Sequence, residues 1–286
     1  MSAASVPATA APRRRSWGSP WAWLIFLIGV SYFVIPLVST IEFSLRAAYK
    51  DPVTGDFIRP SLAAYELVLR DPKFTGGLIT SFRIALITIV VSLVLLVPTA
   101  YWVRLKVPRL RPVVELITLM PFVIPPVVLV FGLIRIYAPP PLALLTSSFG
   151  TEAVLVGAYV GLSFPYMYRA VDTGLATIDV RTLTEAAQSL GAGWPRILWS
   201  VIFPNLRGAL HAGAFLTLAI VMGEYTIASF MSVKTFGPYL SLLGQNKAYE
   251  PAAGAIISFA ITWAAMFAIV IVGRGSRDRT TIGGAR

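Results

Sequence analysis

Long apolar runs separated by short polar segments recur along most of this chain. Six of these runs reach the roughly 20 residues that an α-helix needs to cross a hydrocarbon core about 30 Å thick. They lie at 21–44, 78–103, 113–137, 150–172, 206–232 and 253–273. The pattern therefore predicts an all-α membrane protein with six transmembrane helices in one domain, residues 21–273.

The two ends of the chain are polar. Residues 1–20 are rich in Ala, Pro and Arg, and both they and residues 274–286 are predicted to be tails. The apolar run that begins at Trp21 is too long for the core of a signal peptide, and no small-residue cleavage site follows it cleanly. We therefore interpret this run as a first span that is retained.

Composition supports the membrane assignment and excludes several kinds of chemistry. The 286 residues are 56% hydrophobic and only 13% charged, which is unusual for a soluble domain. The chain has no cysteine, so disulfides, thiolate metal sites and cysteine nucleophiles are excluded. The net charge of +11 comes mostly from basic residues that flank apolar runs, which indicates a lipid bilayer rather than a nucleic acid as the partner.

The basic residues also predict the orientation. Six spans place both termini on one side, and that side would hold fifteen of the 24 Lys and Arg residues. The short connector "RLKVPRLRP" alone carries four of them. Because short cytoplasmic loops are enriched in Lys and Arg, we expect both termini and the loop at 173–205 to be cytoplasmic.

Prolines are expected to interrupt three of the spans. Pro121, Pro125 and Pro126 lie in the third span, Pro98 in the second and Pro165 in the fourth. Each frees a carbonyl that hydrocarbon cannot satisfy, so neighbouring helices or a wet cavity must do so. Kinked packing and a lined pathway both remain open.

Between the fourth and fifth spans, residues 177–208 read "TIDVRTLTEAAQSLGAGWPRILWSVIFPNLRG", a polar, helix-prone stretch that includes most of the 173–205 loop. Asp179 or Thr182 can cap a first helix, and Thr182 with Glu185 has the spacing of a capping box. Gly191 then stands where the residue after a helix adopts a positive φ. The sequence predicts a short helix that ends at this glycine.

A second short helix is predicted after the glycine. It should begin near Gly193, with Pro195 in its first turn, and end at Pro204. Its apolar residues recur at helical spacing and form one stripe, made of Trp194, Ile197, Leu198, Val201 and Ile202. We expect a compact helix–turn–helix on the cytoplasmic surface, with this stripe buried and Glu185 near the tip.

Three roles for this helix pair can be compared. A plain linker would not need two capped helices, and a helix that only rests on lipid would have a lysine-rich polar face, which is missing. A docking element for a cytosolic partner agrees best with the small alanines and the charge of Glu185.

The loop resembles the EAA motif of membrane permease subunits of bacterial ATP-binding-cassette (ABC) importers. That motif is E-A-A, three residues, G, nine residues, then I-x-L-P. The matching residues are Glu185, Ala186, Ala187, Gly191 and Pro204, with Val201 and Phe203 in place of the isoleucine and leucine. The likeness extends to the proline-rich third span and to "GEYTIASF" in the fifth, and is closest to the polyamine, opine and phosphonate branch.

The resemblance implies a type I ABC importer permease fold in a bacterial inner membrane. In such importers the EAA loop forms coupling helices that dock on a pair of cytosolic ATP-binding subunits, and an extracytoplasmic binding protein delivers the solute. It also implies a second, different permease subunit, and no cofactor or metal. A polyamine such as spermidine or putrescine is the expected solute, with an opine, a phosphonate or another small solute as the alternative.

The chain itself is not expected to hydrolyse ATP. No lysine follows a glycine, so the phosphate-binding pattern G-x-x-x-x-G-K-[ST] is absent. The rival functions are an intramembrane enzyme or a secondary transporter that works without an ATPase. A cluster of catalytic residues inside the membrane finds little support. The sequence has one histidine, His211, and one acidic residue that is predicted to lie far from the membrane surfaces.

That acidic residue is Glu224, predicted to lie well inside the fifth span. Ionisable groups inside a membrane are costly, so Glu224 is a candidate for contact with a cationic solute, with the ring of Tyr225 beside it. The alternative is a structural hydrogen bond, or an ion pair with Arg83 or Arg135. The sequence leaves both open.

Overall fold

The protein is described here by a computed structural model that covers residues 20–274 except 48, 51–54, 56 and 59. The predicted tails fall almost wholly outside the described residues. The helices are α1 (Pro20–Ser44), α2 (Ala63–Arg70), α3 (Pro72–Leu105), α4 (Arg111–Val123), α5 (Pro126–Tyr137), α6 (Ser148–Ala176), α7 (Val180–Ser189), α8 (Trp194–Ile197), α9 (Phe203–Asn205), α10 (Arg207–Gly223), α11 (Thr226–Phe230), α12 (Phe236–Asn246) and α13 (Glu250–Arg274).

Short elements join some of these helices. The 3₁₀ turns η1 (Pro108–Leu110) and η2 (Leu144–Thr146) precede α4 and α6, and a π-helical turn, η3 (Leu198–Ile202), lies between α8 and α9. The strands β1 (Tyr49–Lys50) and β2 (Phe57–Ile58) form a two-residue antiparallel ribbon in which Tyr49 faces Ile58. The prediction of an all-α membrane fold is confirmed.

Within the described residues, three helices are long and apolar enough by themselves to cross a membrane. They are α1, α3 and α13, the last through Ala268, and the number rises to five if each of two bent helix pairs counts as one span. The bent pairs are η1–α4 with α5, at 99°, and α8–α9 with α10, at 81°. The central helix α6 has 29 residues, which is also long enough to cross.

Two predicted spans are not continuous helices. The run at 113–137 is broken between α4 and α5, because Pro125 and Pro126 follow each other and force Ile124 into an extended conformation. The run at 206–232 ends as a helix at Gly223, before α11 begins. In contrast, α3 continues through Pro98 and α6 through Pro165, so the expectation that these prolines interrupt their spans was wrong.

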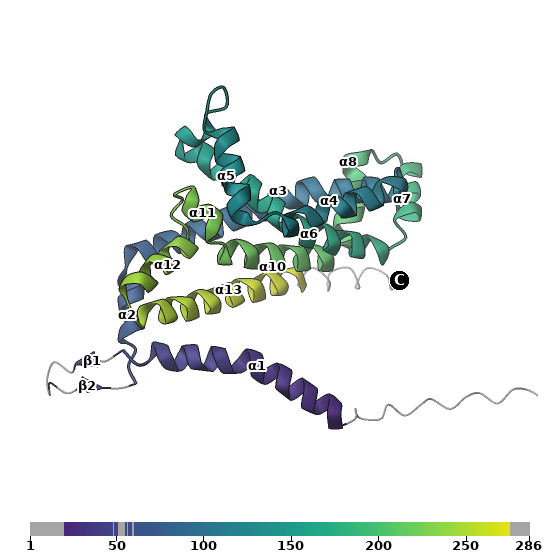
Figure 1. Cartoon of the computed structure of the whole chain (residues 1–286). Coiled ribbons are helices and arrows are strands. Elements are labelled where there is room, and N and C mark those ends of the chain that lie inside the picture. The colour runs from purple at the N-terminus through teal and green to yellow at the C-terminus, as the bar shows by residue number, and fades with distance from the viewer. Residues whose placement is uncertain (1–19, 48, 51–54, 56, 59, 275–286) are drawn as a thin grey trace, which may run out of the picture.

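The centre of the bundle is formed by α6 packed against α3 and α10 (Figure 1). Fully buried side chains such as Ile84 of α3 and Leu155 of α6 make up this core, and Ser92 and Ser163 face each other with their hydroxyl oxygens 3.3 Å apart. Close approach of α10 to α6 depends on Gly174, where a side chain would overlap Ala209.

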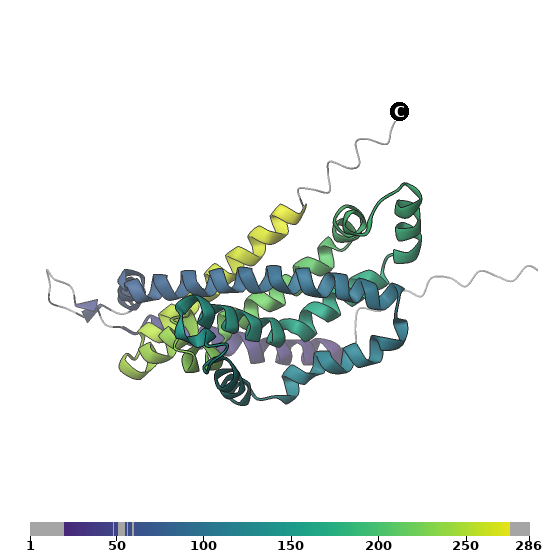
Figure 2. The ribbon, with the colours of Figure 1, turned by 90° about the horizontal axis from the view of Figure 1, so that it is seen from above.

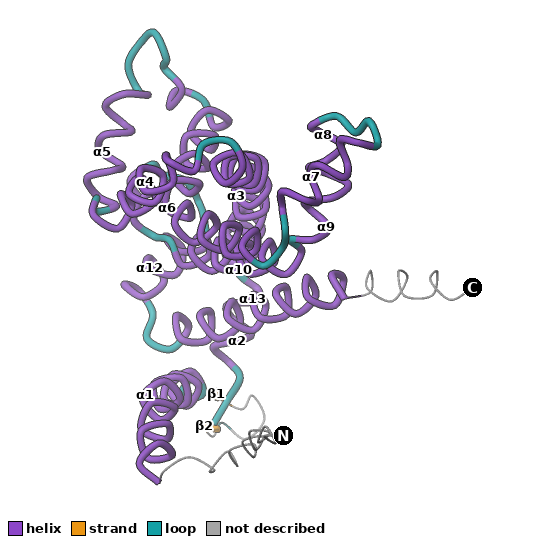
Figure 3. Tube along the Cα trace, turned by 90° about the vertical axis from the view of Figure 1, so that its right-hand side faces the viewer, coloured by secondary structure: helices purple, strands orange, loops and turns teal. Residues whose placement is uncertain are grey.

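Two features lie outside this centre. Helix α1 contacts α13, and its apolar side chains are exposed. Figure 3 shows the trace of α1 set apart from the centre formed by α3, α6 and α10. Helices α7 and α8 project from one end of the bundle, and α11, α12 and the β-ribbon lie toward the other end (Figure 2). The functional candidates are therefore divided between two ends of the molecule.

Candidate functional site

Helix α7 begins at a side-chain cap. The Asp179 carboxylate accepts a hydrogen bond from the backbone N–H of Thr182 at 3.1 Å and another from the Thr182 hydroxyl at 2.7 Å. The capping box of Thr182 with Glu185 is not formed, because Glu185 accepts instead from Arg181 Nε at 2.8 Å, one helical turn earlier. Asp179 takes the cap because its short side chain reaches the free amides of the first turn.

The two helices of the loop are joined by a tight turn at Gly191. Its φ is +78°, as the sequence predicted, and its N–H donates to the Gln188 carbonyl at 2.9 Å. The N–H of Ala192 donates to the Ala187 carbonyl at 3.0 Å, which completes a Schellman motif. The turn leaves the Leu190 side chain at the tip of the loop, 88% exposed.

The second half of the loop buries its apolar stripe. Pro195 lies in the first turn of α8, as predicted, and Ile197, Leu198 and Ile202 are at most 5% exposed. Pro204 does not end the helix, contrary to expectation. It lies inside α9, preceded by η3, in which the N–H of residue 203 donates five residues back to Leu198. This widened turn accommodates a proline that cannot donate to the carbonyl four residues earlier.

The loop is fastened to α3 through Tyr101. This tyrosine is 1% exposed, its hydroxyl lies 2.9 Å from the Thr184 hydroxyl of α7, and its ring meets Trp194 of α8 edge to face at 5.6 Å. One side chain therefore connects both helices of the loop to a transmembrane helix. Sequence reasoning missed Tyr101, because it lies 83 residues from Thr184 and belongs to an apolar run with no local signal.

The residues that resemble the EAA motif occupy different environments. Glu185 and Ala186 are exposed, Ala187 is half-buried against the core, and Pro204 is half-buried near the junction with α10. The structure therefore brings Glu185, Ala186 and the Gly191 turn to one protruding end and leaves Pro204 apart from them. Between α7 and the end of α3 lies a cavity of about 580 Å³, whose polar lining includes Arg104, Lys106, Asp179 and Glu185.

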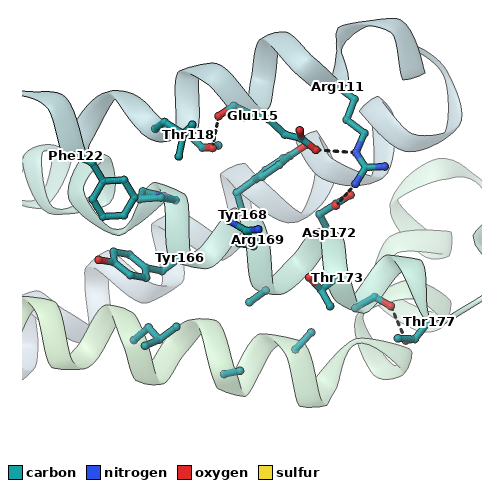
Figure 4. A pocket seen from close by; sticks show the side chains of 17 residues that line it. Arg111, Glu115, Thr118, Phe122, Tyr166, Tyr168, Arg169, Asp172, Thr173 and Thr177 are labelled. Atoms are coloured by element: carbon teal, nitrogen blue, oxygen red, sulfur yellow. Dashed lines mark hydrogen bonds and ion pairs between the residues drawn. The ribbon is translucent and has the colours of Figure 1, made fainter.

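An ion cluster joins three helices near the base of the loop. The Asp172 carboxylate of α6 accepts from Arg104 of α3 at 3.3 Å and from Arg111 of α4 at 2.8 Å. Arg111 also donates to Glu115 at 2.9 Å. Figure 4 shows Arg111, Glu115 and Asp172 of this cluster beside a cavity of about 810 Å³, which is lined by residues of α4, α6 and α10, Tyr166 among them.

Glu224 and Tyr225 lie at the opposite end of α10. The expectation that Glu224 lies well inside a continuous span was wrong. Glu224 lies at the break that follows Gly223, where it is 9% exposed and accepts three hydrogen bonds. The structural hydrogen bond that the sequence left open is thus present, and Arg83 pairs with Glu152 instead. Tyr225 is 44% exposed and lines a separate cavity of about 670 Å³ between α10, α12 and α13.

Within the described part of the chain no cluster of His, Asp and Glu suits a metal ion.

The Asp179 cap yields a first prediction. Hydrogen bonds from Thr182 lower the pKa of the Asp179 carboxyl. Because the pKa in the folded state lies below that of the unfolded chain, the stabilisation is complete at neutral pH. It is lost only as the pH falls through the folded-state value, below about 4. Asp179→Ala should therefore accelerate amide hydrogen exchange in α7 at neutral pH.

Asp71 provides the matched control for this prediction, because it caps α3 in the same way through the N–H of Lys73. Asp71→Ala should leave exchange in α7 unchanged. Equal exchange of α7 in the parent protein and in Asp179→Ala would show that the cap contributes nothing to the loop.

The fold and the loop together define a class: a polytopic membrane permease that has a short helix pair at one end. The chain belongs to the family of binding-protein-dependent transport system inner membrane components, whose model matches residues 96–278. The identification as an ABC importer permease of type I fold is confirmed. Membership of this family implies an ATP-binding subunit and a substrate-binding protein as partners.

Individual proteins agree with the family assignment. The chain is 30% identical to the molybdenum transport system permease ModB of Azotobacter vinelandii, over 51% of this chain and 68% of the relative. It is 26% identical to the spermidine/putrescine permease PotB of Escherichia coli, over 57% and 63%. Among solved structures it resembles a bacterial ABC transporter for alginate import, with a TM-score of 0.60, 20% identity, and coverage of 96% of this chain and all of that one.

Proposed function

We propose that this chain forms the membrane path of an importer that takes a small hydrophilic solute from an extracytoplasmic binding protein. A pair of cytosolic ATP-binding subunits, docked on the α7–α8 loop, drives the cycle. The observation that carries this proposal is the construction of the loop: a closed turn with an exposed tip, on a base that is buried against a transmembrane helix.

This construction is suited to transmitting motion. Glu185, Ala186 and Leu190 face outward and are available for contact, whereas Thr184 and Trp194 are held by Tyr101 of α3. A displacement of the tip by a partner would therefore reach α3 without first unfolding the loop. Switching between inward-facing and outward-facing states requires such a rigid connection between partner and bundle.

Cysteine crosslinking tests the docking. The chain has no native cysteine, so Ala186→Cys introduces a single exposed thiol on the outer face of α7. We expect it to crosslink to a cysteine in the loop-binding cleft of the ATP-binding subunit, in membranes that contain the whole transporter. Asn246→Cys, exposed at the end of α12, is the control and should label with maleimide but not crosslink. Failure of Ala186, Gln188 and Leu190 variants alike, in an intact complex, would exclude the proposed surface.

The charge of Glu185 gives a second prediction. Glu185→Lys should lower solute-stimulated ATPase activity more than it lowers the amount of protein in the membrane. Arg181→Glu breaks the same exposed ion pair and controls for a purely internal effect. If Glu185 contacts the partner, Glu185→Lys should lower ATPase activity clearly more than Arg181→Glu does. Equal losses from the two variants would mean that Glu185 acts only through its ion pair within α7.

Two solute classes follow from the relatives. An oxyanion of the molybdate type is favoured, because the molybdenum permease has the higher identity and Glu224 is already engaged by three hydrogen bonds. A polyamine is the second candidate, favoured by the spermidine/putrescine relative. Uptake of labelled molybdate and of labelled spermidine by cells with the complete transporter distinguishes the two classes. Unlabelled oxyanions should inhibit only the uptake of molybdate, and unlabelled polyamines only the uptake of spermidine.

A second permease subunit, different from this chain, completes the proposal. One chain presents one α7–α8 loop, whereas a pair of ATP-binding subunits offers two places for docking. Native mass measurement of the detergent-extracted transporter should give two permeases for two ATP-binding subunits. A complex that is competent in transport and contains a single permease would contradict this composition.

A further inference from the structure

The junction between α10 and α11 is held by a single buried carboxylate. Helix α10 ends at Gly223, and Glu224 has the extended conformation φ −77°, ψ 128°. Residues 207–230 contain no proline, so the break does not come from a missing backbone donor. The side chain of Glu224 instead supplies acceptors that make the break stable.

Both oxygens of this carboxylate are occupied. Oε1 accepts from the N–H of Ile227 at 2.7 Å, and Oε2 accepts from the N–H of Ala228 at 3.1 Å and from the hydroxyl of Tyr159 at 2.8 Å. The two amides belong to the first turn of α11, where a helix has no internal acceptors for its N–H groups. Glu224 therefore caps α11 and at the same time ties it to Tyr159 of α6.

The surroundings leave little room for a solute at this carboxylate. Tyr159, Ile227 and Ala228 are all fully buried, and no Lys or Arg in the described part of the chain forms an ion pair with Glu224. Three donors satisfy the buried charge, as burial requires. An ammonium group would have to displace these donors before it could bind.

The backbone at this point is equally constrained. A side chain at Gly237, near the start of α12, would overlap the Glu224 carbonyl oxygen and lie 3.1 Å from its carbon. The neighbouring N–H of Phe236 donates to Ser81 of α3 at 2.9 Å. The joint at Glu224 is therefore the place where α6, α10, α11 and α12 are fixed relative to one another.

We propose that Glu224 is a positioning residue of the transport cycle and not a contact for the solute. Held by Tyr159, its carboxylate keeps α11 folded against α6 and so fixes the end of α10 farthest from the α7–α8 loop. Helix α10 is 17 residues long, about 25 Å, and connects that loop with this joint. The part of the proposal that concerns transport rests on the proposed function, but the part that concerns the joint does not.

Thiol labelling tests the joint directly. Ser229→Cys is nearly isosteric and places a half-buried thiol in α11 of a chain that has no native cysteine. In membranes, adding Tyr159→Phe or Glu224→Gln should raise its rate of alkylation by N-ethylmaleimide about fivefold, as expected for loss of one buried hydrogen bond. Glutamine keeps the shape of Glu224, but its NH₂ group is a donor and cannot accept a hydrogen bond from one of the three donors around it.

Two controls accompany this measurement. Ser232→Cys, exposed just after α11, should label at the same rate in every background. Tyr32→Phe removes a tyrosine hydroxyl from α1, where the ring is exposed, and should change nothing. Tyr159→Phe is the milder of the two test variants, and its result stands if Glu224→Gln fails to accumulate.

Uptake separates positioning from binding. Both test variants should lower the maximal rate severalfold at an unchanged half-saturating concentration, and the double variant should be no worse than Glu224→Gln alone. Unchanged labelling in both variants would overturn the proposal, as would a loss of uptake in Glu224→Gln with normal uptake and labelling in Tyr159→Phe. Labelling needs no transport, so absence of uptake in the parent would refute the proposed function and leave the joint unaffected.

Discussion

Replacing Gly191 by alanine should open the turn at the tip of the α7–α8 loop and sharply reduce transport. At φ +78° any side chain strains the backbone, by about 1–2 kcal/mol, although there is open space where the Cβ would lie. That energy corresponds to a roughly 5- to 30-fold shift away from the closed turn. We expect ATP-dependent uptake to fall by about the same factor, and limited proteolysis in membranes to cut the loop faster.

Two variants sharpen this prediction. Gly193→Ala is the matched control, because Gly193 also has open space around it but an ordinary φ of −74°. It should behave like the parent protein. Gly191→Asn should be intermediate, since asparagine tolerates a positive φ better than alanine does. If Gly191→Ala and Gly193→Ala were equally active, the turn geometry would not matter for coupling.

Gly237→Ala should have the largest effect on the stability of the bundle. Its Cβ would overlap a backbone oxygen, that of Glu224, and this oxygen cannot rotate away as a flexible side chain would. The start of α12 would have to move, which costs at least the roughly 1–3 kcal/mol typical of overpacking. We expect a much lower yield of folded protein and a lower unfolding temperature in detergent.

Gly223 supplies the comparison for this variant. It lies next to Glu224 at the end of α10, and a Cβ there would have no atom within 4 Å. Gly223→Ala should be as stable as the parent or slightly more stable, because alanine favours the helix. A Gly237→Ala protein that unfolds at the same temperature as Gly223→Ala would mean that α12 can shift freely at this position.

The features that could be predicted from the sequence are those that depend on residues close together in the chain. The φ of Gly191, the position of Pro195 and the buried stripe that includes Ile197 depend on residues within one or two helical turns of each other. Apolar runs likewise predicted where most helices lie, because length and hydrophobicity are properties of the run itself.

Features that depend on contacts between distant parts of the chain, or on which of several side chains makes a contact, could not be predicted in the same way. Whether Asp179 or Thr182 caps α7 depends on which of two short side chains reaches the free amides, and spacing allowed both. The end of α10 at Glu224 depends on a donor from Tyr159, 65 residues earlier. Proline alone was also a poor guide, because α3 and α6 continue through theirs while the pair Pro125–Pro126 breaks the chain.

Helix α1 has a bearing on how the protein is assembled in the bilayer. None of its most apolar 18-residue window is buried in the bundle, and its mean hydropathy of 2.3 is close to that of α3. Lipid can therefore solvate α1 almost completely before any later helix is present, whereas α3 must find α6 and α10 to cover its polar residues, Ser92 among them. Insertion of α1 into the bilayer and its docking on the rest of the bundle are thus separable events.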